Sequence, residues 1–205
     1  IPVFTAEVAG VRQPITGGLE VAAGPGGGVL LYFGTGSYSF DTDVTDQSVQ
    51  TIYSVLDTSP TTPVTKFRSN LAAQQLLPTG GGTQRTLNAS AVNYVTQSGW
   101  LMDLAVVSGG VPQFKGERFV GTPRVQSGLI LFPTFEPGGT VIDPCAVGGT
   151  NWLYALNAVS GTAALSGLRT GSPDGAAAAA GTVGTRLDTA GSTPVKDVAV
   201  LLLPT

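Results

Sequence analysis

The densest group of side chains that could do chemistry is acidic, because Asp41, Asp43 and Asp46 lie within a few positions of one another. Carboxylates at alternating positions are typical of Ca²⁺ loops, since this hard cation prefers oxygen ligands. Here the next alternating position is Thr45, and no glycine or terminal glutamate follows in the required register. The three aspartates are therefore weak metal candidates. We expect a solvated turn in which Asp46 accepts backbone N–H bonds.

Nucleophilic and acid–base chemistry is restricted by a chain that has one cysteine, Cys145, and no histidine. The missing histidine excludes Ser–His and Cys–His pairs, histidine zinc sites and the usual general base at neutral pH. The run Gly24–Gly28 lacks the Gly-Lys-Ser/Thr ending of a phosphate loop and predicts a hairpin turn. Four glutamates are too far apart in the sequence to predict a paired-carboxylate site: Glu7, Glu20, Glu117 and Glu136. We therefore expect no catalytic residues, no evident cofactor and no enzymatic activity.

The composition indicates which elements and partners the chain can have. With 29 glycines and 14 prolines, long helices are disfavoured and short strands separated by turns are expected. The ten basic residues are scattered, which argues against nucleic acid as a partner. No run approaches the roughly 18 apolar residues of a membrane span. The N-terminus, Ile1–Phe4, has no signal-peptide shape, so we expect any export signal to lie upstream in a longer protein.

Apolar and β-branched runs bounded by glycine and proline predict several strands. Residues 67–77 could form a helix, because their apolar residues fall near helical spacing. Pro63 and Pro78 on either side argue against it, so both alternatives stay open. Residues 171–184, with their alanine run, predict a flexible insertion loop. The predicted strands are 28–36, 50–57, a hairpin of 123–125 with 129–132, 152–157 and 198–203.

An internal repeat favours one arrangement of these strands. Tyr53 and Tyr154 occupy similar strands 101 positions apart, a distance that holds two propeller blades of about 40–50 residues each. Arg85–Asn88 and Gly99–Leu104 would supply the strands between them. We therefore predict an all-β partial β-propeller of three to four antiparallel blades, with a β-sandwich as the alternative. The large aromatic residues are expected to pack between blades and not to form a ligand platform: Tyr53, Trp100, Trp152 and Tyr154.

Three groups of motifs, in order along the chain, resemble the PilY group of type IV pilus biogenesis proteins. Phe33–Tyr38 and Asp46–Asp57 are similar to its "FGTG.Y" and "D.S.Q..Y...D" segments. Gly99–Leu104 with Gly116–Arg118 resembles "GWYLDL…GER", and Asp143–Leu156 resembles "DPC..GG..WLYAL". The resemblance extends from Gln13 to Ala158 and is carried by the order of the motifs together.

This resemblance implies a fold and a role. The chain, 1–205, would be part of a single C-terminal β-propeller domain related to quinoprotein propellers. The protein would be extracellular or at the cell surface, at the pilus tip or outer membrane, and would promote pilus biogenesis, surface attachment and twitching motility. Its partners would be pilin or minor pilin subunits, the rest of its own polypeptide, and a host or abiotic surface. The alternatives are a scaffold propeller of an outer-membrane assembly machine and a degenerate quinoprotein dehydrogenase.

The chain departs from the family in ways that affect its expected sites. A length of 205 residues holds about four blades at most, so a closed propeller would need more chain. Some family members bind calcium, but no D-x-[DN]-x-D-G loop is present here, so calcium is implied by the resemblance only. Cys145 lies within a resembling motif, which favours a disulfide to a segment outside this chain over a buried free thiol.

Overall fold

The computed structural model describes residues 1–58, 64–138, 148–166, 168, 178–187 and 193–199. The regular elements in this part of the chain are strands and three short 3₁₀ turns. The short 3₁₀ turns are Pro25–Gly27, Asp41–Val44 and Arg68–Asn70. No helix in this part of the chain is long and apolar enough to span a bilayer. The strands are β1 (Glu7–Val8), β2 (Val11–Arg12), β3 (Glu20–Ala23), β4 (Val29–Gly34), β5 (Thr51–Asp57), β6 (Ala72–Pro78), β7 (Gln84–Asn88), β8 (Gly99–Ser108), β9 (Val111–Gln113), β10 (Arg124–Gln126), β11 (Leu129–Pro137), β12 (Gly149–Asn157) and β13 (Thr182–Leu187).

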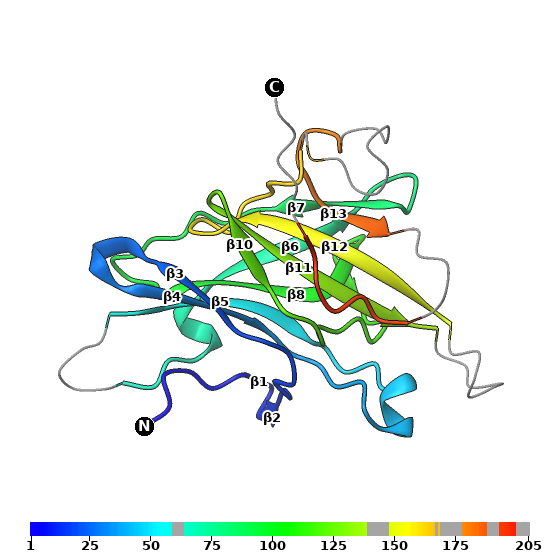
Figure 1. Cartoon of the computed structure of the whole chain (residues 1–205), viewed down its shortest axis with the longest axis horizontal. Coiled ribbons are helices and arrows are strands. Elements are labelled where there is room, and N and C mark those ends of the chain that lie inside the picture. The colour runs from blue at the N-terminus through cyan, green and yellow to red at the C-terminus, as the bar shows by residue number, and fades with distance from the viewer. Residues whose placement is uncertain (59–63, 139–147, 167, 169–177, 188–192, 200–205) are drawn as a thin grey trace.

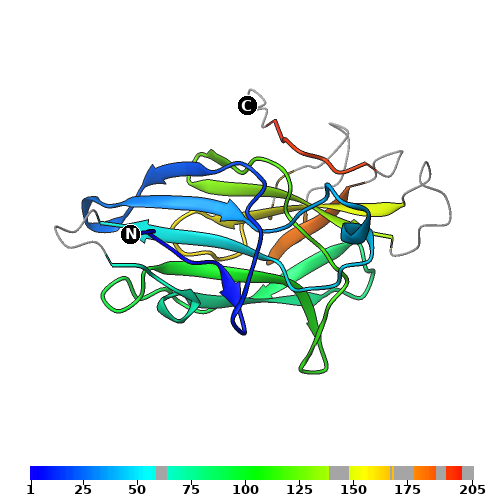
Figure 2. The same ribbon diagram turned by 90° about the horizontal axis from the view of Figure 1, so that it is seen from below.

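Most of these strands join into one sheet. Its order is β10-β11-β12-β13-β7-β6-β8-β5-β4-β3, with β9 paired to the end of β8, while β1 and β2 form a separate small hairpin. Neighbours are antiparallel except for β6 and β8, which run parallel. The end strands β3 and β10 lie close to each other, so the sheet curls into a nearly closed barrel (Figures 1 and 2).

The core lies inside this curled sheet, and alternate residues of each strand point into it. Its largest members come from opposite walls and include Tyr32, Trp100, Phe132 and Tyr154, each with no exposed surface. Outside β4, β5 and β8, Phe4 and Ala6 of the N-terminal segment cover a second apolar cluster. This second layer explains why the strands are apolar on both faces without a neighbouring blade on each side.

The all-β prediction is confirmed, whereas the described strands do not separate into stacked four-stranded blades. Strands β10 to β13 form an antiparallel meander, and β3-β4-β5-β8 form a second four-stranded antiparallel unit. Each unit has the size of a propeller blade. Strand β6 pairs with β8 of one unit, and β7 pairs with β13 of the other. Because β6 and β7 also pair with each other, the two units form one continuous sheet around one main core.

The two four-stranded units have the same strand order along the chain, but the inward-facing residues do not follow the predicted spacing of 101 positions. Tyr154 points into the main core, whereas Tyr53 points to the outer cluster under the N-terminal segment. The inward residues that correspond are Ile52 with Trp152 and Leu56 with Leu156. A slip of one position moves a strand residue to the other face, so Tyr53 and Tyr154 are not equivalent.

The predicted strands 28–36, 50–57 and 152–157 correspond to β4, β5 and β12. The predicted hairpin is β10 and β11, joined by Ser127 and Gly128, which both have positive φ as the twist of a two-residue hairpin requires. The predicted turn at Gly24–Gly28 connects β3 to β4.

Three segments differ from the elements that their sequence patterns favour or leave open. Of the two alternatives left open for 67–77, the absence of a helix is correct, because only Arg68–Asn70 turns and Ala72–Pro78 is strand β6, with alternating burial at Ala72, Gln74 and Leu76. The predicted insertion loop extends too far, because Thr182–Gly184 begin β13; residues 171–177 lie outside the described residues. Of the predicted strand 198–203, residues 198–199 are not in a strand and 200–203 lie outside the described residues.

Candidate functional site

A polar network lies inside the otherwise apolar core, and four separate segments contribute to it. Arg85 is on β7 and Tyr154 on β12, while Thr134 and Glu136 are two residues apart on one face of β11. Glu117 precedes Arg118, whose backbone pairs with that of Phe135 on β11. This pairing places the Glu117 side chain beside the polar residues of β11.

Glu117 is the centre of the network. One carboxylate oxygen accepts hydrogen bonds from Thr134 at 2.6 Å and from the Tyr154 hydroxyl at 2.8 Å. The other oxygen forms an ion pair with the Arg85 guanidinium, which also contacts Tyr154. Arg85 additionally reaches Glu136 at 3.3 Å and stacks over the Trp152 ring, with 3.7 Å from its central carbon to the ring centroid. The inner charges are thus satisfied by one another.

Gly184 makes the contact between Arg85 and Tyr154 possible. This glycine lies on β13, between the two residues in the sheet, and pairs with both of them. A side chain there would place its Cβ 2.5 Å from the Tyr154 ring. Because glycine leaves that space open, the Tyr154 ring lies over β13 and its hydroxyl contacts Arg85 on β7.

Burial and charge set the protonation states in the network. Burial alone would lower the pKa of Arg85, but the nearby Glu117 and Tyr154 raise it above the ordinary arginine value. Burial raises the pKa of Tyr154 well above that of a free tyrosine. The network therefore favours the charged form of Arg85 and the neutral form of Tyr154, whose hydroxyl donates to Glu117.

A pocket of about 230 Å³ opens from the outer side of this network. Its lining comes from the β6–β7 turn, from β8 and β9, and from the network residues Arg85, Glu117 and Trp152. Glu136, with 18% of its side chain exposed, lies between the buried network and the solvent. Lys115, 65% exposed, approaches Glu136 to 3.7 Å. Glu117 and Glu136 are too far apart in the sequence to predict a common site, and the structure corrects this expectation by bringing both to Arg85.

Arg118, the last residue of the "GER" motif, has a separate structural task. Its side chain is buried and donates hydrogen bonds to the backbone oxygens of Gly116, Ser37 and Asp46 at 2.5–2.8 Å. Burial lowers its pKa below the ordinary arginine value. Gly36, in a conformation with φ of +148°, passes so close that a Cβ would lie 2.6 Å from the Arg118 side chain. The motifs resembling "FGTG.Y" and "GER" are therefore two sides of one contact.

Two of the three aspartates in the acidic cluster stabilise the loop that Arg118 holds. Asp43 accepts hydrogen bonds from the Ser37 hydroxyl and from the backbone of Ser39 and Phe40. Asp46 accepts two bonds from Ser48, one from its backbone and one from its hydroxyl, as the predicted turn requires. Asp41 is exposed at the start of the 3₁₀ turn. Among the described residues no group of three or more acidic, histidine or cysteine side chains is arranged to hold a metal.

We expect the loop to lose stability in acid through Asp43. Burial alone would raise the pKa of Asp43, but hydrogen bonds from Ser39, Ser37 and Phe40 and the charge of Arg118 lower it. Its contribution is therefore complete above the ordinary aspartate pKa and is lost as the pH falls through the lowered value. The difference in melting temperature between wild type and Asp43→Asn should be positive at neutral pH and should shrink in acid. Asp41→Asn in the same turn is the control, and an equal pH dependence there would contradict the assignment.

The remaining predicted sites divide into two groups. Trp100 and Tyr53 are packed in apolar clusters, as expected, although the clusters belong to one curled sheet. Trp152 and Tyr154 pack in the core and also contact Arg85, a role that the sequence analysis missed. Tyr154 and Glu117 lie within resembling motifs, but no local pattern predicts that Arg85 joins them. Cys145 lies outside the described residues.

The fold and this site define an all-β domain built on one curled sheet, with a buried ion-pair network beneath a small pocket. No family model matches the chain. It is 40% identical over 98% of its length to a type IV pilus biogenesis factor PilY1 homologue of Xylella fastidiosa, and 31% identical over 78% of its length to PilY1 of Pseudomonas aeruginosa strain PAO1. It spans only 13% and 15% of those two proteins.

A solved structure shares the fold. The C-terminal domain of Pseudomonas aeruginosa PilY1 superposes on 92% of this chain with a TM-score of 0.65 at 23% identity, and 42% of that domain is covered. The chain is homologous to the PilY1 family of type IV pilus biogenesis factors.

Proposed function

We propose that this chain is a structural and adhesive module of the type IV pilus system and acts by protein–protein contact and surface attachment, without bond chemistry. The observation that carries the proposal is the 40% identity to a PilY1 homologue over nearly the whole chain. The working location is the cell surface, at the pilus tip or outer membrane, with pilin or minor pilin subunits as partners and twitching motility as a dependent process.

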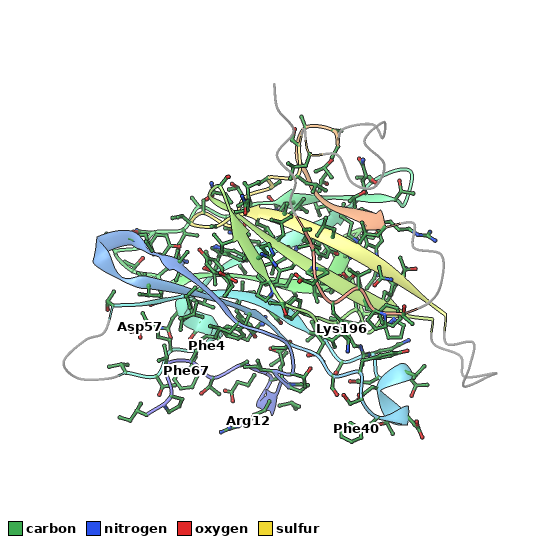
Figure 3. All side chains as sticks on the ribbon, viewed as in Figure 1. Phe4, Arg12, Phe40, Asp57, Phe67 and Lys196 are labelled. Atoms are coloured by element: carbon green, nitrogen blue, oxygen red, sulfur yellow. The ribbon has the colours of Figure 1, made fainter. Side chains whose placement is uncertain are left out.

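Exposed apolar side chains support a contact role. Phe40 is 72% exposed at the tip of the loop held by Arg118, and Phe67 is 44% exposed. Figure 3 shows both on the lower side of the molecule, away from the strands β7 and β13. Phenylalanine rings contribute much of the binding energy of a protein interface when a partner covers them, and these two are exposed.

The quinoprotein-like propeller remains part of the proposal for the larger domain. The two four-stranded units have the size and order of blades, and the chain covers 42% of the solved homologous domain. In the complete protein, we expect further strands to extend this arrangement. Calcium is expected from the family resemblance alone. The described residues contain no cluster of side chains that would hold it.

The proposal is tested by removing this segment from the full-length protein in its own cells. Loss of surface pili and of attached cells, with the protein still exported, is the expected result. Crosslinking should recover pilin subunits; recovery of outer-membrane assembly proteins with normal piliation would favour the scaffold alternative. Alcohol oxidation after reconstitution with quinone and calcium would show an enzyme and overturn the non-enzymatic part.

A further inference from the structure

The pocket above Arg85 has the dimensions of a site for one small ring. Its volume of about 230 Å³ is below the range of roughly 300–1,000 Å³ for sites that hold drug-sized ligands. Pro78, Leu104, Val106 and Trp152 supply apolar surface to its lining. A ligand that fits must present an apolar face to these residues and polar groups to the charged residues of the same lining.

The charges around the pocket balance. Arg85 is paired with Glu117 and Glu136, and Lys115 is the second cation. An anionic ligand would therefore meet the carboxylate of Glu136, and a cationic ligand would meet the ammonium group of Lys115. Since neither sign of charge is favoured, the pocket suits a neutral ligand.

Glu136 and Lys115 nevertheless have hydrogen-bonding capacity to spare. The contacts of Glu136 with Arg85 at 3.3 Å and with Lys115 at 3.7 Å are both longer than the usual 2.7–3.2 Å of an N–H···O bond. A carboxylate offers about four acceptor sites and an ammonium three donors. Glu136 can thus accept from ligand hydroxyls while Lys115 donates to them.

The nearest strand edge does not favour an extended peptide as the ligand. Strand β9, which borders the pocket through Gln113, pairs only with β8 among the described strands. Its central residue is Pro112, which has no N–H to donate to an added strand. A ligand here must be held by side chains and not by backbone pairing.

We propose that this pocket binds a single uncharged sugar ring of a glycan, with its hydroxyls between Glu136 and Lys115 and its C–H face on the apolar lining. A sugar hydroxyl is both donor and acceptor, which matches a site that offers both in a neutral surrounding. The proposal deepens the adhesive part of the proposed function and names the chemical class of its ligand.

The test uses saturation-transfer NMR on the purified protein with a panel of neutral hexoses, N-acetylhexosamines and their disaccharides. At least one saccharide should receive saturation at its ring C–H protons. Lys115→Ala, at an exposed position, and Glu136→Gln, which keeps the side-chain shape, should each weaken binding by about tenfold. The control Arg12→Ala also removes one exposed cation, but from β2, at the lower edge of the molecule in Figure 3. It should leave binding unchanged.

Several results would overturn the sugar site. These are no transfer to any saccharide by protein that circular dichroism shows to be folded, equal binding by all three variants, or stronger competition by acetyl-lysine or acetyl-glutamate amide peptides than by sugars. Cells carrying Lys115→Ala should still assemble pili but attach less to saccharide-coated surfaces. A failed sugar assay beside lost piliation in the segment deletion would reject this site and leave the proposed function standing.

Discussion

Replacing Glu117 by glutamine is expected to destabilise the protein by about 3–5 kcal/mol, because it leaves the Arg85 charge buried without its main partner. The two side chains are 3% and 6% exposed, so water cannot replace the lost carboxylate. Glu136 compensates only in part, since its contact with Arg85 is 3.3 Å long. Urea unfolding followed by tryptophan fluorescence measures the change.

Asp103→Asn is the matched control for this prediction. Asp103 forms an ion pair with Arg68 through two hydrogen bonds, but the two side chains are 37% and 23% exposed. Solvent screening should limit the loss there to about 1 kcal/mol. If Glu117→Gln costs no more than Asp103→Asn, the buried network does not stabilise the fold as described.

The double variant Arg85→Met with Glu117→Leu separates the buried-charge cost from packing. Without either charge, no ion is left unpaired, so the double variant should be less destabilised than the sum of its single changes. An additive result would show that the two residues do not interact energetically. Such a result would also mean that the hydrogen bonds of Tyr154 to Arg85 and Glu117 do not couple these residues in stability.

Replacing Gly99 by alanine is the second change with a large expected effect. Gly99 begins β8 with φ of +129°, a conformation that residues with a side chain rarely adopt. An added Cβ would lie 2.0 Å from the backbone oxygen of Ser54 on the neighbouring strand β5. Both the backbone strain and the clash must be relieved by moving one strand, at a cost of about 3 kcal/mol or more.

Gly80→Ala is the control for Gly99→Ala. Gly80 lies in the β6–β7 turn, and a Cβ there meets nothing within 4 Å. We expect its stability to stay within about 1 kcal/mol of wild type. Thermal melting and resistance to limited proteolysis compare the two, and a Gly99→Ala protein that melts with wild type would show that β8 tolerates a side chain at its first residue.

The elements of this protein were largely predictable from local pattern. Short apolar runs ending in glycine correctly indicated β4, β5 and β12, and Ser127-Gly128 indicated the β10–β11 hairpin. The region of β6 was ambiguous, because Leu71, Gln75 and Leu76 also fit a helical spacing. Pairing decides for the strand: β6 forms a hairpin with β7 and also pairs in parallel with β8, where Ala72 lies opposite Trp100, a partner that local spacing does not indicate.

The polar site was determined by tertiary structure alone. Arg85 is 32 residues from Glu117 and 69 from Tyr154, and it meets them because β13 joins β7 to β12 across the sheet. The amino-acid sequence by itself determined that the chain forms short strands and turns, since backbone preferences and alternating burial act over a few residues. Which strands become neighbours, and hence which charges share the core, depends on long-range packing of the whole sheet, which no local spacing encodes.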